Sequence, residues 1–189
     1  VCSSDLAELD RDAAAEAIEQ AWQSSEPAFR ARAAWTLARI GSPAARDRMS
    51  AWLEDGRVKL DAPTLAAFGL LPAPGADDEA PDPAWGELED RLWTRYAVTE
   101  DPAEADALLL AIARTGGSRS PGRLAADLAV LPPAEDEPRY VHGMEALAIL
   151  CVRGHALPED GLRAVAQGLD APTPGPRRAA AYALGRCAS

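Results

Sequence analysis

The chain has 189 residues, of which 48% are hydrophobic, 26% are charged and 5% are aromatic, so it can bury a sizeable core. Its formal net charge of −11 at pH 7 argues against nucleic acid and anionic membrane surfaces as partners, because lysine and arginine supply most of the affinity for phosphate groups. No run of 18 or more apolar residues occurs, so membrane insertion is not expected.

The two ends of the chain differ from the middle. Val1–Leu6 resembles one reading frame of a short-read sequencing adapter, and we expect residues 1–9 to be artefactual or disordered. The alternative is a mature lipoprotein that begins near a lipidated Cys2, although no apolar segment precedes that cysteine in the sequence. The last alanine-rich segment has little polar outer face, so the chain is expected to be a fragment of a longer protein.

Apolar periodicity and the placement of proline and glycine divide the rest into helix pairs. The first pair spans about 10–41, and its second helix runs from Pro27, a first-turn proline, to a left-handed stop at Gly41. One face of that helix is apolar and is expected to pack on a neighbour: Phe29, Ala33, Leu37 and Ile40.

Four further pairs follow, and their second helices begin about 33 to 42 residues apart. They are expected at about 42–72, 83–116, 120–154 and 157–188, within a single solenoid over 10–189. Residues 72–83 are rich in proline and acid, which indicates an exposed loop centred on Asp77–Glu79.

One helical pattern occurs near both ends of the chain. Arg32–Gly41 and Arg178–Cys187 share an arginine followed by small and apolar residues at the same spacing. First helices that end in Leu-x-Asp or a close variant, as in Gly168–Asp170, complete a pattern that resembles HEAT repeats. Arg177–Gly185 carries the clearest copy. The predicted fold is therefore all-α, a right-handed α-α superhelix of about five HEAT-like (armadillo-like) helix pairs.

The resemblance implies a non-catalytic scaffold that binds protein partners along a concave face lined by second helices. The alternative is a regulatory or substrate-positioning segment of a larger enzyme, a peptidyl-prolyl isomerase or a bilin lyase-like parent, whose catalytic part lies elsewhere. The alanine-, arginine- and proline-rich composition is similar to that of bacterial, often envelope-associated, HEAT proteins. Two cellular locations are compatible with the sequence: the cytoplasm or, if the parent protein is a lipoprotein, the periplasm.

No catalytic, cofactor-binding or metal-binding set is predicted, and the only histidines, His142 and His155, lack the spacing of metal ligands. Trp85 is expected to be an exposed anchor beside the acidic loop, whereas Trp35 and Trp52 are expected in the core. The arginines at both ends either bind a partner or bond the neighbouring repeat. The candidate partner-binding residues are Arg30, Arg32, Arg39, Trp85, Arg177 and Arg178.

The three cysteines are Cys2, Cys151 and Cys187. They form no C-x-x-C motif, and an odd number at wide spacing predicts neither a disulfide framework nor a zinc site. Cys151 and Cys187 are therefore interpreted as buried small apolar residues.

Overall fold

The structure is a computed structural model that describes residues 3–23, 26–55, 60–73, 82–133 and 137–188. All regular secondary structure in these ranges is helical, which confirms the all-α prediction. The helices are α1 (Ser3–Gln23), α2 (Pro27–Ile40), α3 (Pro43–Glu54), α4 (Ala62–Ala67), the 3-10 turn η1 (Phe68–Leu70), α5 (Pro83–Val98), α6 (Pro102–Thr115), α7 (Ser120–Val130), α8 (Glu137–Val152), α9 (Glu159–Leu169) and α10 (Pro174–Cys187).

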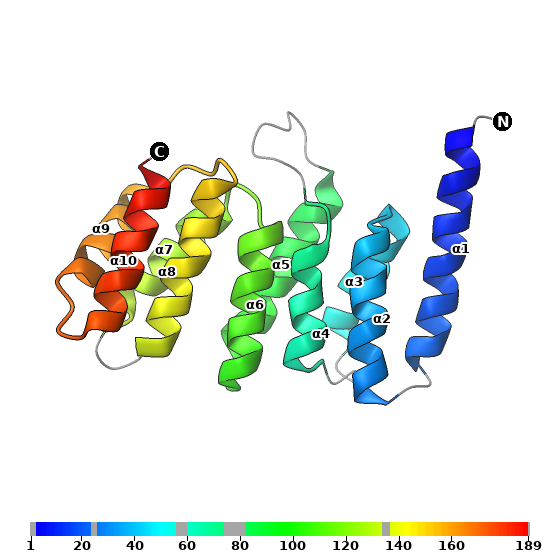
Figure 1. Cartoon of the computed structure of the whole chain (residues 1–189), viewed down its shortest axis with the longest axis horizontal. Helices are drawn as coiled ribbons and strands as arrows, with labels where there is room; N and C mark the ends of the chain where they lie inside the picture. Colours follow the sequence, from blue (N-terminus) through cyan, green and yellow to red (C-terminus); the bar gives the residue numbers. More distant parts are fainter. Residues whose placement is uncertain (1–2, 24–25, 56–59, 74–81, 134–136, 189) are drawn as a thin grey trace.

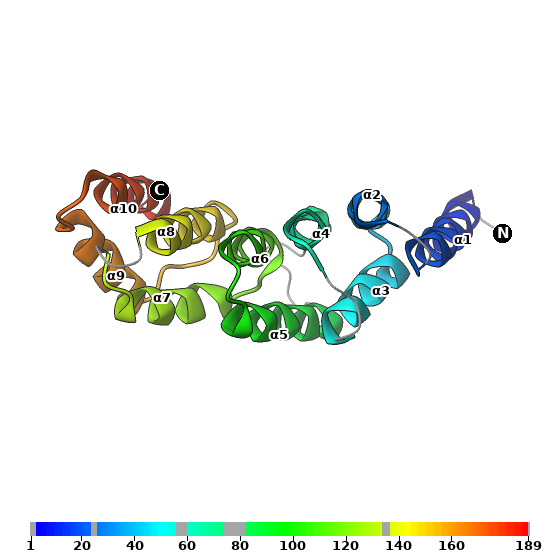
Figure 2. The same cartoon turned by 90° about the horizontal axis from the view of Figure 1, so that it is seen from below.

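The helices stack side by side into an elongated solenoid. Figure 1 looks onto the row formed by α2, α4, α6, α8 and α10. Figure 2 shows that α3, α5, α7 and α9 form a second row behind it, and that the first row lies along the inside of a shallow arc. Successive helices of the inner row contact each other from α2 to α10. Each pair therefore buries its apolar surface against its neighbours, which is how a solenoid is stabilised.

Local chemistry sets the ends of the helices. Ser42, Asp61 and Asp101 each accept a hydrogen bond from a backbone N–H in the first turn of the helix that follows. Gly41 ends α2 with a left-handed φ of 63°, and its N–H donates to the carbonyl of Leu37. Because such caps satisfy backbone groups that a helix end leaves open, they limit how far each helix extends.

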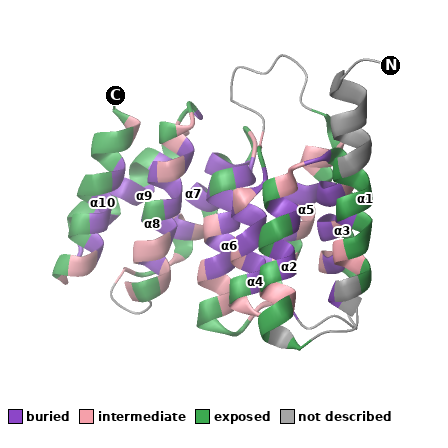
Figure 3. Cartoon of the chain, turned by 45° about the vertical axis from the view of Figure 1, so that its right-hand side comes forward, coloured by how far each residue is buried: buried purple, intermediate pink, exposed green. Residues whose placement is uncertain are grey.

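The core runs through the middle of the solenoid and is rich in alanine and leucine (Figure 3). Leu37, Leu108 and Leu147 of the inner row are completely buried. At the N-terminal end, Trp22 of α1 stacks on Trp52 of α3 with ring centroids 3.8 Å apart. Burying the two rings against each other ties the first helix pair to the second.

The packing of α2 corrects one prediction. Ala33 and Leu37 are buried, as the apolar stripe predicts, but Phe29 and Trp35 are each 47% exposed. The prediction that Trp35 lies in the core was wrong. The small residues Ala34 and Ala38 take the buried positions beside it, which leaves the large ring on the outer face.

Two helix ends also differ from the predictions. The first helix begins at Ser3, whereas a start at Asp10 was expected. The second helix of the pair expected at about 42–72 consists of α4 and η1 and ends before Leu71, because the residue before a proline avoids the helical conformation. The acidic centre of the predicted loop, Asp77–Glu79, lies outside the described residues.

The interpretation of Cys151 and Cys187 as separate apolar residues was also wrong. Their sulfur atoms form a disulfide that links the end of α8 to the end of α10, with Cα atoms 5.0 Å apart. The two residues are 36 positions apart, about the length of one repeat. That separation places equivalent positions of neighbouring inner helices side by side.

Candidate functional site

The outer face of α2 exposes a stripe of polar and aromatic side chains. Arg32, Trp35, Thr36 and Arg39 follow the i, i+3, i+4, i+7 spacing of one helix face, and all four are exposed. Thr36 Oγ1 donates to the backbone carbonyl of Arg32 at 2.9 Å, and this hydrogen bond does not involve the Arg32 guanidinium. We call these four residues the α2 stripe. It lies on the inner row and faces away from the core.

The two arginines of the α2 stripe differ from the arginines that join neighbouring helices. Arg46, Arg48 and Arg91 each form ion pairs with carboxylates of a neighbouring element. Within the described part of the chain, neither Arg32 nor Arg39 takes part in an ion pair. The stripe thus presents two positive charges on either side of a half-exposed indole ring.

The last helix presents a related surface at the other end. Arg178 and Tyr182, one turn apart on α10, are both exposed, and the guanidinium of Arg186 lies 5.3 Å from the centroid of the Tyr182 ring. Arg177 instead donates to the carbonyls of Ala171 and Pro172 and holds the turn before α10. Of the two predicted residues on α10, only Arg177 makes such hydrogen bonds to backbone carbonyls, and Arg178 does not.

The remaining predicted residues take part in the fold. Arg30 is half-buried and interacts within the chain. Trp85 is half-buried against the core, and the guanidinium of Arg46 lies 5.3 Å from its ring centroid. Arg46 also pairs with Asp82 at 2.6 Å. A hydrogen bond from the N–H of Ala84, together with Arg46, lowers the pKa of the Asp82 carboxyl. Trp85 thus belongs to a joint between α3 and α5 instead of standing as an exposed anchor.

The middle of the inner row is acidic. Asp106 of α6 and His142 of α8 are in contact, with Oδ1 and Nδ1 2.5 Å apart. A cavity of about 210 Å³ opens beside them between α6 and α8. It is lined by Asp106, Leu109, Leu110, His142, Glu145, Ala146 and Ile149. We call it the α6–α8 cavity. Sequence inspection did not single it out, because its residues come from two helices.

A wider groove of about 840 Å³ lies on the outer row, between α5 and α7. Its polar groups bond to one another: Tyr96 donates to Asp127 at 3.0 Å, and Arg139 donates to both. Burial, together with the Asp127 charge, raises the pKa of Tyr96 to about 12, so the phenol stays protonated. This network joins the third pair to the fourth and leaves few groups free for a ligand.

The described residues offer little that points to chemistry. Among them, no three His, Cys, Asp or Glu side chains gather so that they could hold a metal ion. The two histidines lie in different surroundings, because His142 lines the α6–α8 cavity and His155 is buried. The same residues include no helix that is long and apolar enough to cross a membrane.

The fold and these surfaces define an α-solenoid, a class of protein that presents an extended face built from repeated helix pairs. A family model of HEAT repeats matches residues 3–63, from α1 to the start of α4, and supports a HEAT-repeat protein. No curated protein and no solved structure matches the chain. The HEAT fold is typically non-enzymatic, and HEAT repeats are generally protein-interaction scaffolds.

Proposed function

We propose that this chain is a non-catalytic scaffold that binds a protein partner across its inner row, anchored at the α2 stripe. The observation that carries the proposal is the exposure of Trp35, 47%, between two arginines without ion-pair partners among the described residues. Tryptophan and arginine are the residues most enriched at binding hot spots, and an exposed indole gains most when a partner covers it.

The charges of the inner row describe the partner. Arg32 and Arg39 at one end and Arg178 at the other favour acidic groups on the bound segment. Neighbouring helices pack about 8–10 Å apart, so α2 and α10 are roughly 32–40 Å apart across four spacings. An extended segment of about ten to twelve residues, at about 3.3 Å each, spans that distance.

The experiment first identifies the partner and then measures its affinity. A photo-crosslinking amino acid replaces Thr36 on α2 in one protein and Leu162 on α9, a 51% exposed residue of the outer row, in another. Cells that produce the protein supply the extract. A protein captured from position 36 and not from position 162 is then purified, and its binding to wild type and variants is measured by calorimetry.

Trp35→Ala is expected to weaken binding of that protein by about thirtyfold, the size of a hot-spot loss. Arg32→Glu with Arg39→Glu should reverse the charge preference and abolish binding. Leu162→Ala and Arg163→Glu, on the outer row, are matched controls and should leave the affinity unchanged. Equal affinities of wild type and the α2 variants, with unchanged helicity, would contradict the proposal.

A further inference from the structure

The α6–α8 cavity has the shape of a side-chain pocket. Leu109 and Ala146 are buried and form its floor, and Leu110 and Ile149 are half-buried beside them. Its volume of about 210 Å³ is below the roughly 300–1,000 Å³ of sites for small-molecule ligands. The cavity therefore suits a single long side chain better than a cofactor.

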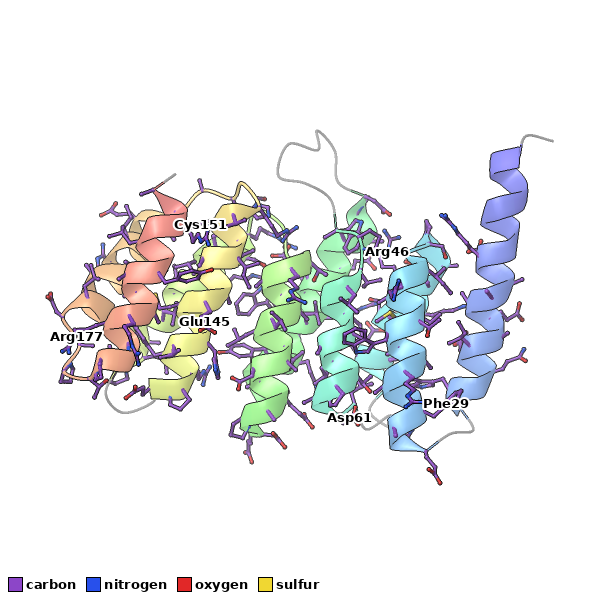
Figure 4. The ribbon with its side chains drawn as sticks, in the orientation of Figure 1. Phe29, Arg46, Asp61, Glu145, Cys151 and Arg177 are labelled. Atoms are coloured by element: carbon purple, nitrogen blue, oxygen red, sulfur yellow. A yellow bond between two sulfur atoms is a disulfide. The ribbon has the colours of Figure 1, made fainter. Side chains whose placement is uncertain are left out.

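Two of the three polar side chains that line the cavity are carboxylates. Glu145, labelled on α8 in Figure 4, is exposed and lines the cavity, and Asp106 contacts His142. Other carboxylates of the described residues, such as Asp90, Asp127 and Asp160, pair with arginine. Among those residues, neither Asp106 nor Glu145 has an arginine partner. Two carboxylates beside an apolar wall form a surface that complements an aliphatic chain ending in a cation.

The spacing along the helices fits such a chain. Asp106 and Leu110 are one turn apart on α6, and a turn rises about 5.4 Å. The four-carbon stem of an extended lysine reaches about 6 Å with carbon–carbon bonds of about 1.5 Å. A stem lying over Leu110 and Ile149 thus places its ammonium group near Asp106 and Glu145. Arg114, one turn beyond Leu110, lies at the opposite end, with its stem beside Gly69.

We propose that the α6–α8 cavity receives a lysine or arginine side chain of the segment that docks on the inner row. The inference rests on the proposed function in one respect, since the partner supplies the side chain. The bound segment then carries a basic residue that meets the acidic centre of the face, with acidic residues on either side that meet α2 and α10.

The test uses the whole chain and a small probe, so it does not depend on finding the partner. The probe is Nα-acetyl-lysine methylamide, and its matched control is the same compound with an acetylated side-chain amine, which keeps the stem and loses the charge. The readout is NMR. With only two histidines in the sequence, the imidazole signals of His142 report the cavity, and those of buried His155 are an internal reference.

The lysine probe should shift the signals of His142 and the methyl groups of Leu110 and Ile149 in a saturable manner, with a Kd of the order of 1–10 mM, as expected for a ligand of this size. The acetylated control should bind at least tenfold more weakly. Asp106→Asn with Glu145→Gln should weaken the lysine probe at least tenfold while the His155 signals stay in place, which shows that the fold is kept.

Equal shifts with both compounds, or shifts that persist in the double variant, would overturn the inference, as would no saturable shift at all. Trp35→Ala should leave probe binding unchanged, because the α2 stripe is three inner helices away from α8. If Trp35→Ala abolishes partner binding but the wild-type protein does not bind the lysine probe, the proposed function stands and only the inference about the cavity is wrong. If the lysine probe binds but Trp35→Ala leaves partner binding unchanged, the inference about the cavity stands and the α2 stripe is not the anchor.

Discussion

Removal of the Cys151–Cys187 disulfide should destabilise the last two helix pairs by about 4 kcal/mol. The bond closes a loop between residues 36 positions apart. For a loop of that length, the chain-entropy relation gives about 13 cal/mol/K, or about 4 kcal/mol at 25 °C. Because each pair of a solenoid contacts only its neighbours, the loss should be confined to the α8–α10 end.

The perturbation is Cys151→Ser with Cys187→Ser, in a protein that also carries Cys2→Ser so that no third thiol takes part. Urea unfolding followed by circular dichroism should show an early transition, with a midpoint about 2 M lower if the slope is about 2 kcal/mol/M. Dithiothreitol should lower the midpoint of the disulfide-bonded protein to that of the variant, and it should leave the variant unchanged.

Two outcomes would refute this reasoning. Two free thiols in the native Cys2→Ser protein, titrated before any reductant is added, would show that the bond does not form. A bond that forms but whose removal leaves the midpoint unchanged would show that α8 and α10 stay together without it, so that closing the loop adds no stability.

Three further predictions concern stability. Trp52→Ala should lower the free energy of unfolding by about 3–5 kcal/mol, because the ring is buried against Trp22. Trp35→Ala should change it by less than about 0.5 kcal/mol, because that ring is half-exposed. Similar urea midpoints for the two variants would contradict the assigned burial. Glu89→Ala should cost about 3 kcal/mol in chemical unfolding, because Ser120 loses a buried charged acceptor at 2.8 Å, and wild-type stability would rule this out. Burial, and then the charge of Arg153, lower the pKa of His155, so the unfolded chain takes up the proton first and stability should fall as pH drops below about 6.5; His155→Asn should flatten that part of a melting-temperature profile, and an unchanged slope would count against the assignment.

The order of helices could be predicted from the sequence because its signals are local. A proline in the first turn and a capping oxygen before it mark helix starts such as that of α3 after Ser42. Gly41 marks a stop because its φ is positive, and a Cβ there would lie 2.8 Å from Pro72 Cγ. These effects depend on residues close in the chain, so no knowledge of the packing is needed to detect them.

The face on which a large side chain lies could not be predicted in the same way. Trp35 is as apolar as Trp52, yet it is half-exposed while Trp52 is 6% exposed. The difference comes from Ala34 and Ala38, whose small side chains occupy the buried side of α2. Hydrophobicity alone does not distinguish an anchor for a partner from a core residue, because both need the same side chain.

Contacts between neighbouring repeats had a signal in the sequence that motif searches miss. Arg46 with Asp82, Asp106 with His142 and Cys151 with Cys187 all join residues 36 positions apart. A lateral contact in a solenoid links equivalent positions of adjacent repeats, so its separation equals the repeat length. Comparing residues at that separation, instead of looking for C-x-x-C, would have paired the two cysteines.

The same separation of 36 residues relates charged side chains on three successive helices of the inner row, α6, α8 and α10. Asp106, His142 and Arg178 follow one another at intervals of 36 and therefore occupy equivalent positions on α6, α8 and α10. With a helix spacing of about 8–10 Å, Arg178 is too far from Asp106 to neutralise it and close enough to meet the next residues of the same bound segment. A segment that crosses this face meets positive charge at α2, negative charge at the α6–α8 cavity and positive charge at α10. Because the cavity lies fewer helix spacings from α10 than from α2, a reversed segment would carry its basic residue away from the cavity, which favours one direction of docking over the other.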